Sequence, residues 1–248
     1  SPAALNVGRA LVVDAQDNVC FGGNFGGAVD FDPDPVQTAL RSAQGADDMF
    51  VVKLTPAGGF VWAWTAGGGD WDDVQALALG PNGHVHVSGT FRGSVDLDGD
   101  SAPDVTSHGD ADILLAELDA DGALVRFDAF GGTGYDAAWG IAVDGAGNRF
   151  ATGFFHDSVD FDPSAGDATL TAHGEYYDGF LLRLGATGDF GWVRQFGGTS
   201  LDAGTGLARD PQGNLLVAGQ FSGTIDFEPS PAGAQFLVGD GSLDGFLM

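Results

Sequence analysis

The chain carries one sequence pattern four times. An acidic pentapeptide reads VDFDP at 29–33, VDLDG at 95–99, VDFDP at 159–163 and IDFEP at 225–229. Its first aspartates, Asp30, Asp96, Asp160 and Asp226, are therefore separated by 66, 64 and 66 residues. A constant period of this size is typical of folds in which each repeat is one small unit that completes its core against its neighbours.

Other positions keep the same register. A turn sequence reads DAQDN, GPNGH, DGAGN and DPQGN, and an aspartate precedes an apolar run at Asp48, Asp112, Asp178 and Asp244. A glycine pair follows an aromatic-rich segment in three of the copies. We therefore expect repeats at 6–73, 74–137, 138–203 and 204–248, the last of them incomplete and the whole belonging to a longer array.

Each repeat predicts four short strands. In the second copy they fall at 74–80, 84–91, 112–119 and 124–131, and tight turns join the first pair and the second pair. The 42 glycines fit many turns, and no segment has a helical period. The prediction is an all-β fold, a β-propeller of four repeats of about 65 residues with four-stranded antiparallel blades. A β-solenoid is the alternative, although its coils are shorter.

The charge balance excludes two classes of partner. Asp and Glu number 35 against 9 Lys and Arg, which gives a net charge of -26. Such a surface repels nucleic-acid phosphates and anionic membranes. No apolar stretch is long enough for a transmembrane helix, and one cysteine, Cys20, allows no internal disulfide. The carboxylates are left to bind cations or to form an acidic, solvated surface.

The run DLDGDSAPD at 96–104 is the strongest chemical signal. Calcium prefers six to eight oxygen ligands, and alternating aspartates can turn several oxygens toward one centre. Gly99 allows the chain to turn sharply within the run. The predicted ligands of this loop are Asp96, Asp98, Asp100 and Asp104.

The other copies keep a thinner version of this loop, in which proline replaces the glycine. The candidate ligands there are Asp30, Asp32 and Asp34, then Asp160, Asp162 and Ser164, then Asp226, Glu228 and Ser230. The aspartate before each third strand could close onto the same ion, which adds Asp48, Asp112, Asp178 and Asp244. The alternative interpretation is an Asx turn, in which the aspartate accepts backbone N–H groups and proline fixes φ.

Zinc and catalysis find less support. The five histidines, His84, His86, His108, His156 and His173, fall at unmatched positions and form no ligand pattern. An active site needs one asymmetric constellation, and none stands out against the repeats. The sequence G-x-S-x-G of a nucleophile elbow does not occur.

The pattern resembles the SBBP-type β-propeller repeats of bacterial secreted and surface proteins. The match is best at DGAGNRFATGFFHDSVDFDP and DPQGNLLVAGQFSGTIDFEP. The resemblance implies a propeller exported to the cell exterior as one module of a longer polypeptide, and it carries no catalytic residues. The second copy departs from the pattern at Gly80 and LDGD, where it resembles the calcium loops of integrin-type propellers.

We therefore expect a non-enzymatic, extracellular, calcium-binding module with a structural, adhesive or assembly role. Its expected partners are calcium, further copies of itself and neighbouring modules. A carbohydrate-binding propeller is the first alternative, with Tyr176 and Tyr177 as candidate glycan contacts in the third copy. A calcium-dependent hydrolase or lyase is the second.

Overall fold

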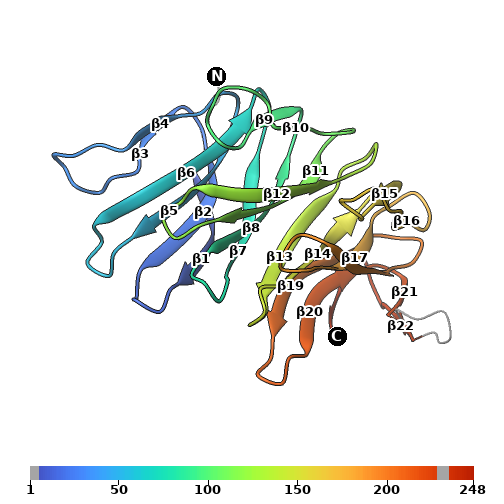
Figure 1. Cartoon of the computed structure of the whole chain (residues 1–248). Coiled ribbons are helices and arrows are strands. Elements are labelled where there is room, and N and C mark those ends of the chain that lie inside the picture. Colours follow the sequence, from blue (N-terminus) through green and yellow to red (C-terminus); the bar gives the residue numbers. More distant parts are fainter. Residues whose placement is uncertain (1–5, 228–234) are drawn as a thin grey trace.

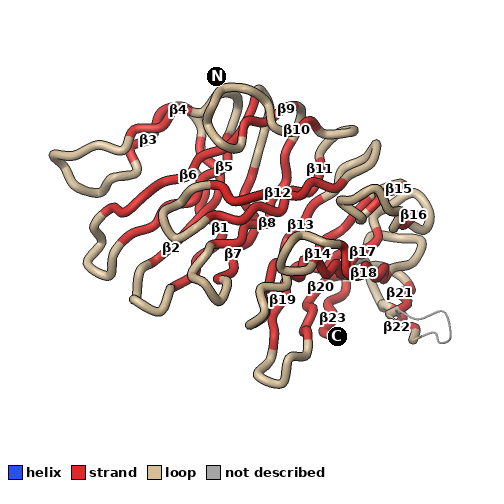
Figure 2. The backbone as a smooth tube through the Cα atoms, in the orientation of Figure 1, coloured by secondary structure: helices blue, strands red, loops and turns tan. Residues whose placement is uncertain are grey.

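The structure is a computed structural model that describes residues 6–227 and 235–248. Every regular element in these residues is a β-strand (Figure 2). The prediction of an all-β fold is therefore confirmed.

The main strands of the second repeat match the predicted ranges closely, and the first repeat has the same order of strands. The first repeat holds β1 (Val7–Val13), β2 (Val19–Phe25), β3 (Ala28–Asp30), β4 (Leu40–Ser42), β5 (Asp48–Leu54) and β6 (Phe60–Gly68). The second holds β7 (Asp73–Leu79), β8 (Val85–Phe91), β9 (Ser94–Asp96), β10 (Val105–Thr106), β11 (Asp112–Leu118) and β12 (Leu124–Phe130).

The last two repeats follow the same order. The third holds β13 (Ala137–Val143), β14 (Arg149–Phe155), β15 (Ser158–Asp160), β16 (Thr169–Thr171), β17 (Asp178–Leu184) and β18 (Phe190–Phe196). The fourth holds β19 (Asp202–Arg209), β20 (Leu215–Phe221), β21 (Thr224–Asp226), β22 (Phe236–Val238) and β23 (Asp244–Leu247).

Each repeat folds into its own antiparallel sheet. The hydrogen-bonded orders are β1-β2-β5-β6, β7-β8-β11-β12, β13-β14-β17-β18 and β19-β20-β23, and the first of these sheets continues through β9 and β10 of the second repeat. The long connection of every repeat adds a short hairpin that the sequence pattern did not predict, namely β3–β4, β9–β10, β15–β16 and β21–β22. Figure 1 shows these hairpins along one rim of the molecule, while the opening strands of the repeats lie on the opposite side.

Aspartates shape the turns between the first two strands. Asp14 accepts hydrogen bonds from the N–H groups of Gln16 and Asn18 at 2.9 Å each. Asp144 and Asp210 hold their turns in the same way. The second repeat has Gly80 here, because a Cβ would lie 2.7 Å from Nε2 of His86.

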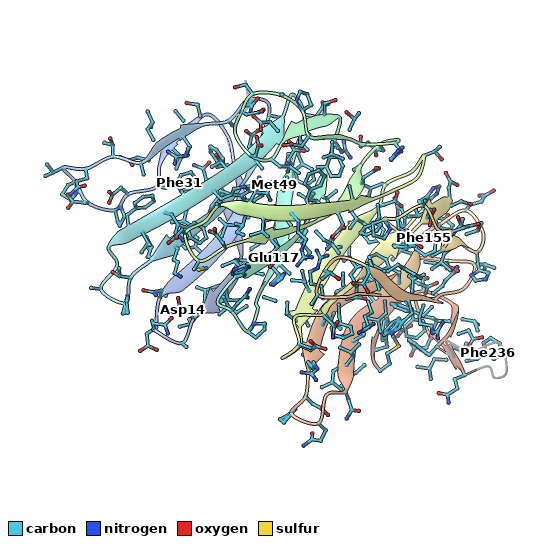
Figure 3. The ribbon with its side chains drawn as sticks, in the orientation of Figure 1. Asp14, Phe31, Met49, Glu117, Phe155 and Phe236 are labelled. Carbon is cyan, nitrogen blue, oxygen red and sulfur yellow. The ribbon has the colours of Figure 1, made fainter. Side chains whose placement is uncertain are left out.

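The hydrophobic cores lie between neighbouring sheets. Cys20 and Val51 of the first sheet share a buried cluster with Leu77 of the second, and Met49, labelled in Figure 3, belongs to the same cluster. Leu115 of the second sheet shares the next cluster with Ile141 of the third. Each sheet thus completes its core against the next, as the constant period predicted.

The glycine pair after each fourth strand allows the next repeat to approach closely. A Cβ on Gly68, Gly132 or Gly198 would lie 2.0, 2.4 or 2.0 Å from the backbone oxygen of Ser94, Ser158 or Thr224, respectively. These residues open the short hairpin of the following repeat. The second glycine of each pair is therefore required by the contact between repeats.

Gly132→Ala tests this requirement. Its Cβ would meet the backbone at Ser158, so the two repeats must separate locally, and we expect a loss of about 1–3 kcal/mol in the free energy of unfolding. The matched control is Gly145→Ala, where a Cβ would meet nothing within 4 Å. Urea unfolding followed by fluorescence measures both, and equal stabilities of the two variants would contradict the argument.

Candidate metal centre

Three carboxylates converge in the long connection of the second repeat. Asp96, Asp98 and Asp104 each place one oxygen so that all three oxygens lie within 4.8 Å of one another. Asp96 is buried, whereas Asp98 and Asp104 are exposed. Carboxylate oxygens in such a group are hard ligands of the kind that calcium prefers.

Backbone hydrogen bonds hold this loop in shape. Asp96 accepts from the N–H of Gly99 at 2.7 Å and from the N–H of Ser101 at 2.8 Å. Asp104 accepts from the N–H of Leu97 at 2.7 Å. Gly99 and Ser101 have φ of 82° and 72°, so the chain reverses twice through the left-handed region. The loop is therefore folded by the same aspartates that could bind the ion.

The loop is also anchored to the first sheet. Leu97 is fully buried in the core between the first two sheets, and Nε1 of Trp64 donates to its carbonyl oxygen at 2.9 Å. Strand β9 pairs with β6, with Gly67 opposite Asp96. The candidate centre consequently sits on the junction of two repeats.

Two of the residues predicted for this centre lie elsewhere. Asp100 accepts the N–H of Ala102 at 2.7 Å and does not belong to the convergent group. Asp112 does not close onto the loop, because its Oδ2 accepts a hydrogen bond from the backbone N–H of His108 and lies 3.1 Å from Nδ1 of the same residue. The backbone places Asp112 under the sheet junction, where it is fully buried.

The loops of the first and third repeats consist of consecutive Asx turns. Oδ1 of Asp30 accepts from the N–H groups of Asp32 and Ala39, and Asp160 does the same with Asp162 and Ala168. Asp32, Asp34, Asp162 and Ser164 each accept an N–H two residues further on. Within residues 6–227 and 235–248, these groups do not converge as Asp96, Asp98 and Asp104 do.

The fourth loop is described only in part. Oδ1 of Asp226 accepts the N–H of Gln235 at 2.9 Å, as Asp30 accepts that of Ala39. Glu228 and Ser230, which the sequence pattern proposed as ligands, lie outside the described residues.

The aspartates before the third strands form a second, internal set. Asp48, Asp112 and Asp178 are buried beside Gly67, Gly131 and Gly197, where a Cβ would lie 2.4, 2.1 and 2.5 Å from their carboxyl carbons. Burial raises the pKa of all three carboxyls, while N–H donors oppose the shift. In the fourth repeat, Asp244 accepts the N–H of Asp240.

Two histidines contact aspartates of this internal set, although their positions in the sequence do not match between repeats. Nδ1 of His108 lies 3.1 Å from Oδ2 of Asp112, and Nδ1 of His173 lies 2.6 Å from Oδ2 of Asp178. The third loop is two residues longer than the second, and one of the two lies between the histidine and its aspartate, which hides the equivalence in the sequence. The two histidines therefore hold equivalent positions beside these aspartates, which the sequence spacing did not show.

Sequence reasoning missed a further carboxylate at each junction. Asp72 accepts the N–H of Gly68 at 2.9 Å and that of Arg92 at 3.0 Å. Asp136 bonds Gly132 and His156 in the same way, and Asp202 bonds Gly198. Each of these aspartates thus ties the glycine pair of one repeat to the repeat that follows. Their register was visible in WDD, YDA and LDA.

Burial shifts the ionisation of these junction carboxyls. It raises the pKa of Asp72 to about 7, of Asp136 to about 6 and of Asp202 to about 7. The neighbouring internal aspartates Asp48, Asp112 and Asp178 repel the negative charge and raise these pKa values further, whereas the N–H donors lower them.

One charged cluster departs from the repeat pattern. Oε1 of Glu117, labelled in Figure 3, lies 2.7 Å from Nδ1 of His84, and Oε2 accepts from Nε of Arg126 at 2.7 Å. Beside it, Arg149 of the third sheet is buried and lies 2.7 Å from Oδ2 of Asp128 of the second sheet. Comparing the four repeats did not reveal this cluster, because the equivalent positions in the other copies hold apolar or unlike residues.

The comparisons with known proteins agree with the repeat pattern. The family model for SBBP, described as a beta-propeller repeat, matches residues 191–220. This segment contains most of β18, all of β19 and most of β20, and it includes Asp202 and the glycine pair before it. The resemblance to this repeat is thereby confirmed. No curated protein matches the chain.

Among the described residues, no helix is both long and apolar enough to span a bilayer.

The junction carboxyls predict a pH dependence of stability. An unfolded aspartate, with a pKa of 3.8, is already ionised at pH 5, whereas folded Asp72 keeps its proton up to about pH 7. Raising the pH from 5 to 8 therefore ionises the group only at a cost to the folded state. We expect the free energy of unfolding, measured in EDTA, to fall by about 1–3 kcal/mol per such group.

Asp72→Asn should reduce this slope, because asparagine stays neutral. Asp121→Asn removes an exposed charge in the turn between β11 and β12 that does not act on Asp72, and it should leave the slope as in the wild type. Urea unfolding at several pH values measures all three proteins. An unchanged slope in Asp72→Asn would contradict the assignment.

Breaking the buried ion pair of Arg149 and Asp128 should greatly lower the free energy of unfolding. Asp128→Asn leaves the Arg149 guanidinium buried without its counter-charge. We expect the free energy of unfolding to fall by about 3–5 kcal/mol. Arg149→Met in the same chain should restore part of this loss. The control is Asp110→Asn, whose partner Arg92 lies at the surface, where a pair is worth about 0–1 kcal/mol. Equal losses at the two pairs would contradict the buried role.

Proposed function

We propose that the chain is a non-enzymatic, extracellular β-propeller module that binds calcium in its second repeat and serves as a structural, adhesive or assembly unit. The convergence of Asp96, Asp98 and Asp104 carries this proposal. These residues offer carboxylate oxygens from one loop at the surface, where water can complete a coordination sphere of six to eight oxygens.

The electrostatics of the chain favour a cation at this loop. The net charge of -26 attracts divalent cations, and three nearby carboxylates repel one another until a cation lies between them. Extracellular calcium modules work with dissociation constants of about 10⁻⁴ to 10⁻³ M, which suits a partly exposed loop. The first and third loops are weaker candidates because their carboxylates do not converge in this way, and the fourth loop is described only in part.

We further propose that each repeat is one blade of a propeller. Two observations support this: the sheets succeed one another around a common side formed by their opening strands, and each packs its core on the next (Figure 1). The match to a beta-propeller repeat supports it too.

The competing functions have less support. The non-repeated cluster of Glu117, Arg126, Asp128 and Arg149 neutralises its own charges between two sheets, which is typical of a structural network rather than an active site. For carbohydrate binding, Tyr177 packs against the rings of Tyr135 and Phe154, so that of this tyrosine pair only Tyr176 is exposed.

Calcium titration of two matched variants tests the metal centre. Asp98 and Asp100 are both exposed and both accept one N–H two residues on, but only Asp98 belongs to the convergent group. We expect Asp98→Asn to weaken calcium binding at least tenfold and Asp100→Asn to change it little. Isothermal titration calorimetry measures the dissociation constants.

Stability gives a second measurement. With a dissociation constant of about 10⁻⁴ to 10⁻³ M, 10 mM calcium should add about 1.4–2.7 kcal/mol to the free energy of unfolding relative to EDTA. Asp98→Asn should lose this gain and Asp100→Asn should keep it. Wild-type protein without calcium binding at 10 mM, or with the same response in both variants, would overturn the proposed centre.

A further inference from the structure

The turn between β7 and β8 differs from the equivalent turns of the other repeats. Each of those turns opens with an aspartate whose Oδ1 accepts two backbone N–H groups. These aspartates are Asp14, Asp144 and Asp210. The second repeat has Gly80 at this position, so the turn lacks the carboxylate that would accept the N–H groups of Asn82 and His84. Fewer hydrogen bonds therefore hold this turn than hold the other three.

Asn82 lies at the exposed tip of this turn. Its Oδ1 accepts the N–H of His84 at 3.4 Å, which is long for a hydrogen bond. The next residue, Gly83, has a φ of 79°, and a Cβ there would meet nothing within 4 Å. Space is therefore open around the peptide bond that joins Asn82 to Gly83.

The chain has five other asparagines, and none of them precedes a glycine. Each is followed by a larger side chain, which hinders access to the next backbone nitrogen. Three of them lie in the equivalent turns, where the side-chain amide donates to the aspartate that opens the turn, namely Asn18, Asn148 and Asn214. Asn24 is buried, and its amide donates to Asp47 at 3.1 Å. Asn82 thus differs from the others both in its neighbour and in its freedom.

We infer that Asn82 is a site of spontaneous covalent modification, at which the asparagine is converted to aspartate and isoaspartate. Asparagine is one of the thermally labile residue types of proteins. The backbone nitrogen of Gly83 loses its proton to hydroxide and attacks Cγ of Asn82, and the amide nitrogen takes up a proton from water and leaves as ammonia. A succinimide ring results. Water then adds to either carbonyl carbon of the ring and opens it, so that an amide has been exchanged for a carboxylic acid.

The reaction requires a local opening of the turn. The N–H of Gly83 donates to the carbonyl oxygen of Gly80 at 3.1 Å, and this bond must break before the nitrogen can reach Cγ of Asn82. Exposed turns open at a small part of the free energy of global unfolding. Opening is easiest in this turn, because no carboxylate at position 80 holds its N–H groups.

The new carboxylate would lie beside a charged cluster. Oδ1 of Asn82 and Nε2 of His86 lie 3.0 and 2.7 Å from the same point, where a Cβ on Gly80 would be. His86 is buried and lies opposite Glu117 in the pairing of β8 with β11. The modification therefore adds a negative charge close to the charged network between the second and third sheets. Isoaspartate also adds a carbon atom to the main chain of the turn.

Anion exchange and peptide mass spectrometry test the inference. Wild-type protein kept in a mildly alkaline buffer should accumulate a more acidic form, with the change of mass in the peptide that contains Asn82. Asn82→Gln should lower the amount of this form about tenfold or more, because the longer side chain would have to close a larger ring. The fold accepts glutamine here, since Gln16 and Gln212 hold the equivalent position. Asn82→Asp provides the standard for the acidic form.

The matched control is Asn214→Gln, which alters an exposed asparagine of an equivalent turn that precedes Leu215. It should form the acidic species at the rate of the wild type. A wild type whose peptide around Asn82 stays unmodified would overturn the inference. An acidic form that accumulates equally in Asn82→Gln, or whose change of mass lies at another asparagine, would overturn it too.

Discussion

The buried carboxylate at each junction is the interaction on which the rest of the structure depends. Asp72, Asp136 and Asp202 each accept the N–H that follows a fourth strand, and Asp72 and Asp136 also accept an N–H from the second strand's end in the next repeat. No single sheet could bury its own apolar faces, so the register between sheets decides whether a core forms at all. A carboxylate that bonds two backbone segments fixes that register to within the length of a hydrogen bond.

The candidate metal centre inherits its geometry from the same junction. Gly67 and Gly68 belong to the segment that Asp72 holds, and they pair directly with Asp96 and Val95 of the acidic loop. Leu97 then inserts into the core between the two sheets. Packing between the two repeats therefore sets the shape of the loop. Its three convergent carboxylates lie on the outer side of this packed region. A cation bound there would stabilise the contact between two repeats as well as the loop.

Much of this could be predicted from the sequence, because repetition reveals what every copy needs. The strands, the turns and the convergence of Asp96, Asp98 and Asp104 all follow from positions that recur or from a known ligand spacing. Spacing could not show that Asp100 turns toward Ala102 or that Asp112 is buried beside Gly131, since both depend on the path of the backbone. The pair of Arg149 and Asp128 was hidden for the opposite reason: it occurs once, and its partners lie on different sheets.

Protonation affects the buried carboxyls at the junctions, whereas the proposed calcium site lies in a loop at the surface. The junction carboxyls are buried, so the folded state favours their protonated form and stability rises as the pH falls through their raised pKa values. Calcium requires ionised ligands, so a falling pH would weaken the calcium binding proposed for the loop. A low pH thus stabilises the contact between repeats through the buried carboxyls. It would also release the cation that is proposed to stabilise the same contact at the surface. With calcium bound as proposed, the repeats would stay joined over a wider pH range than either the buried carboxyls or the cation alone would allow.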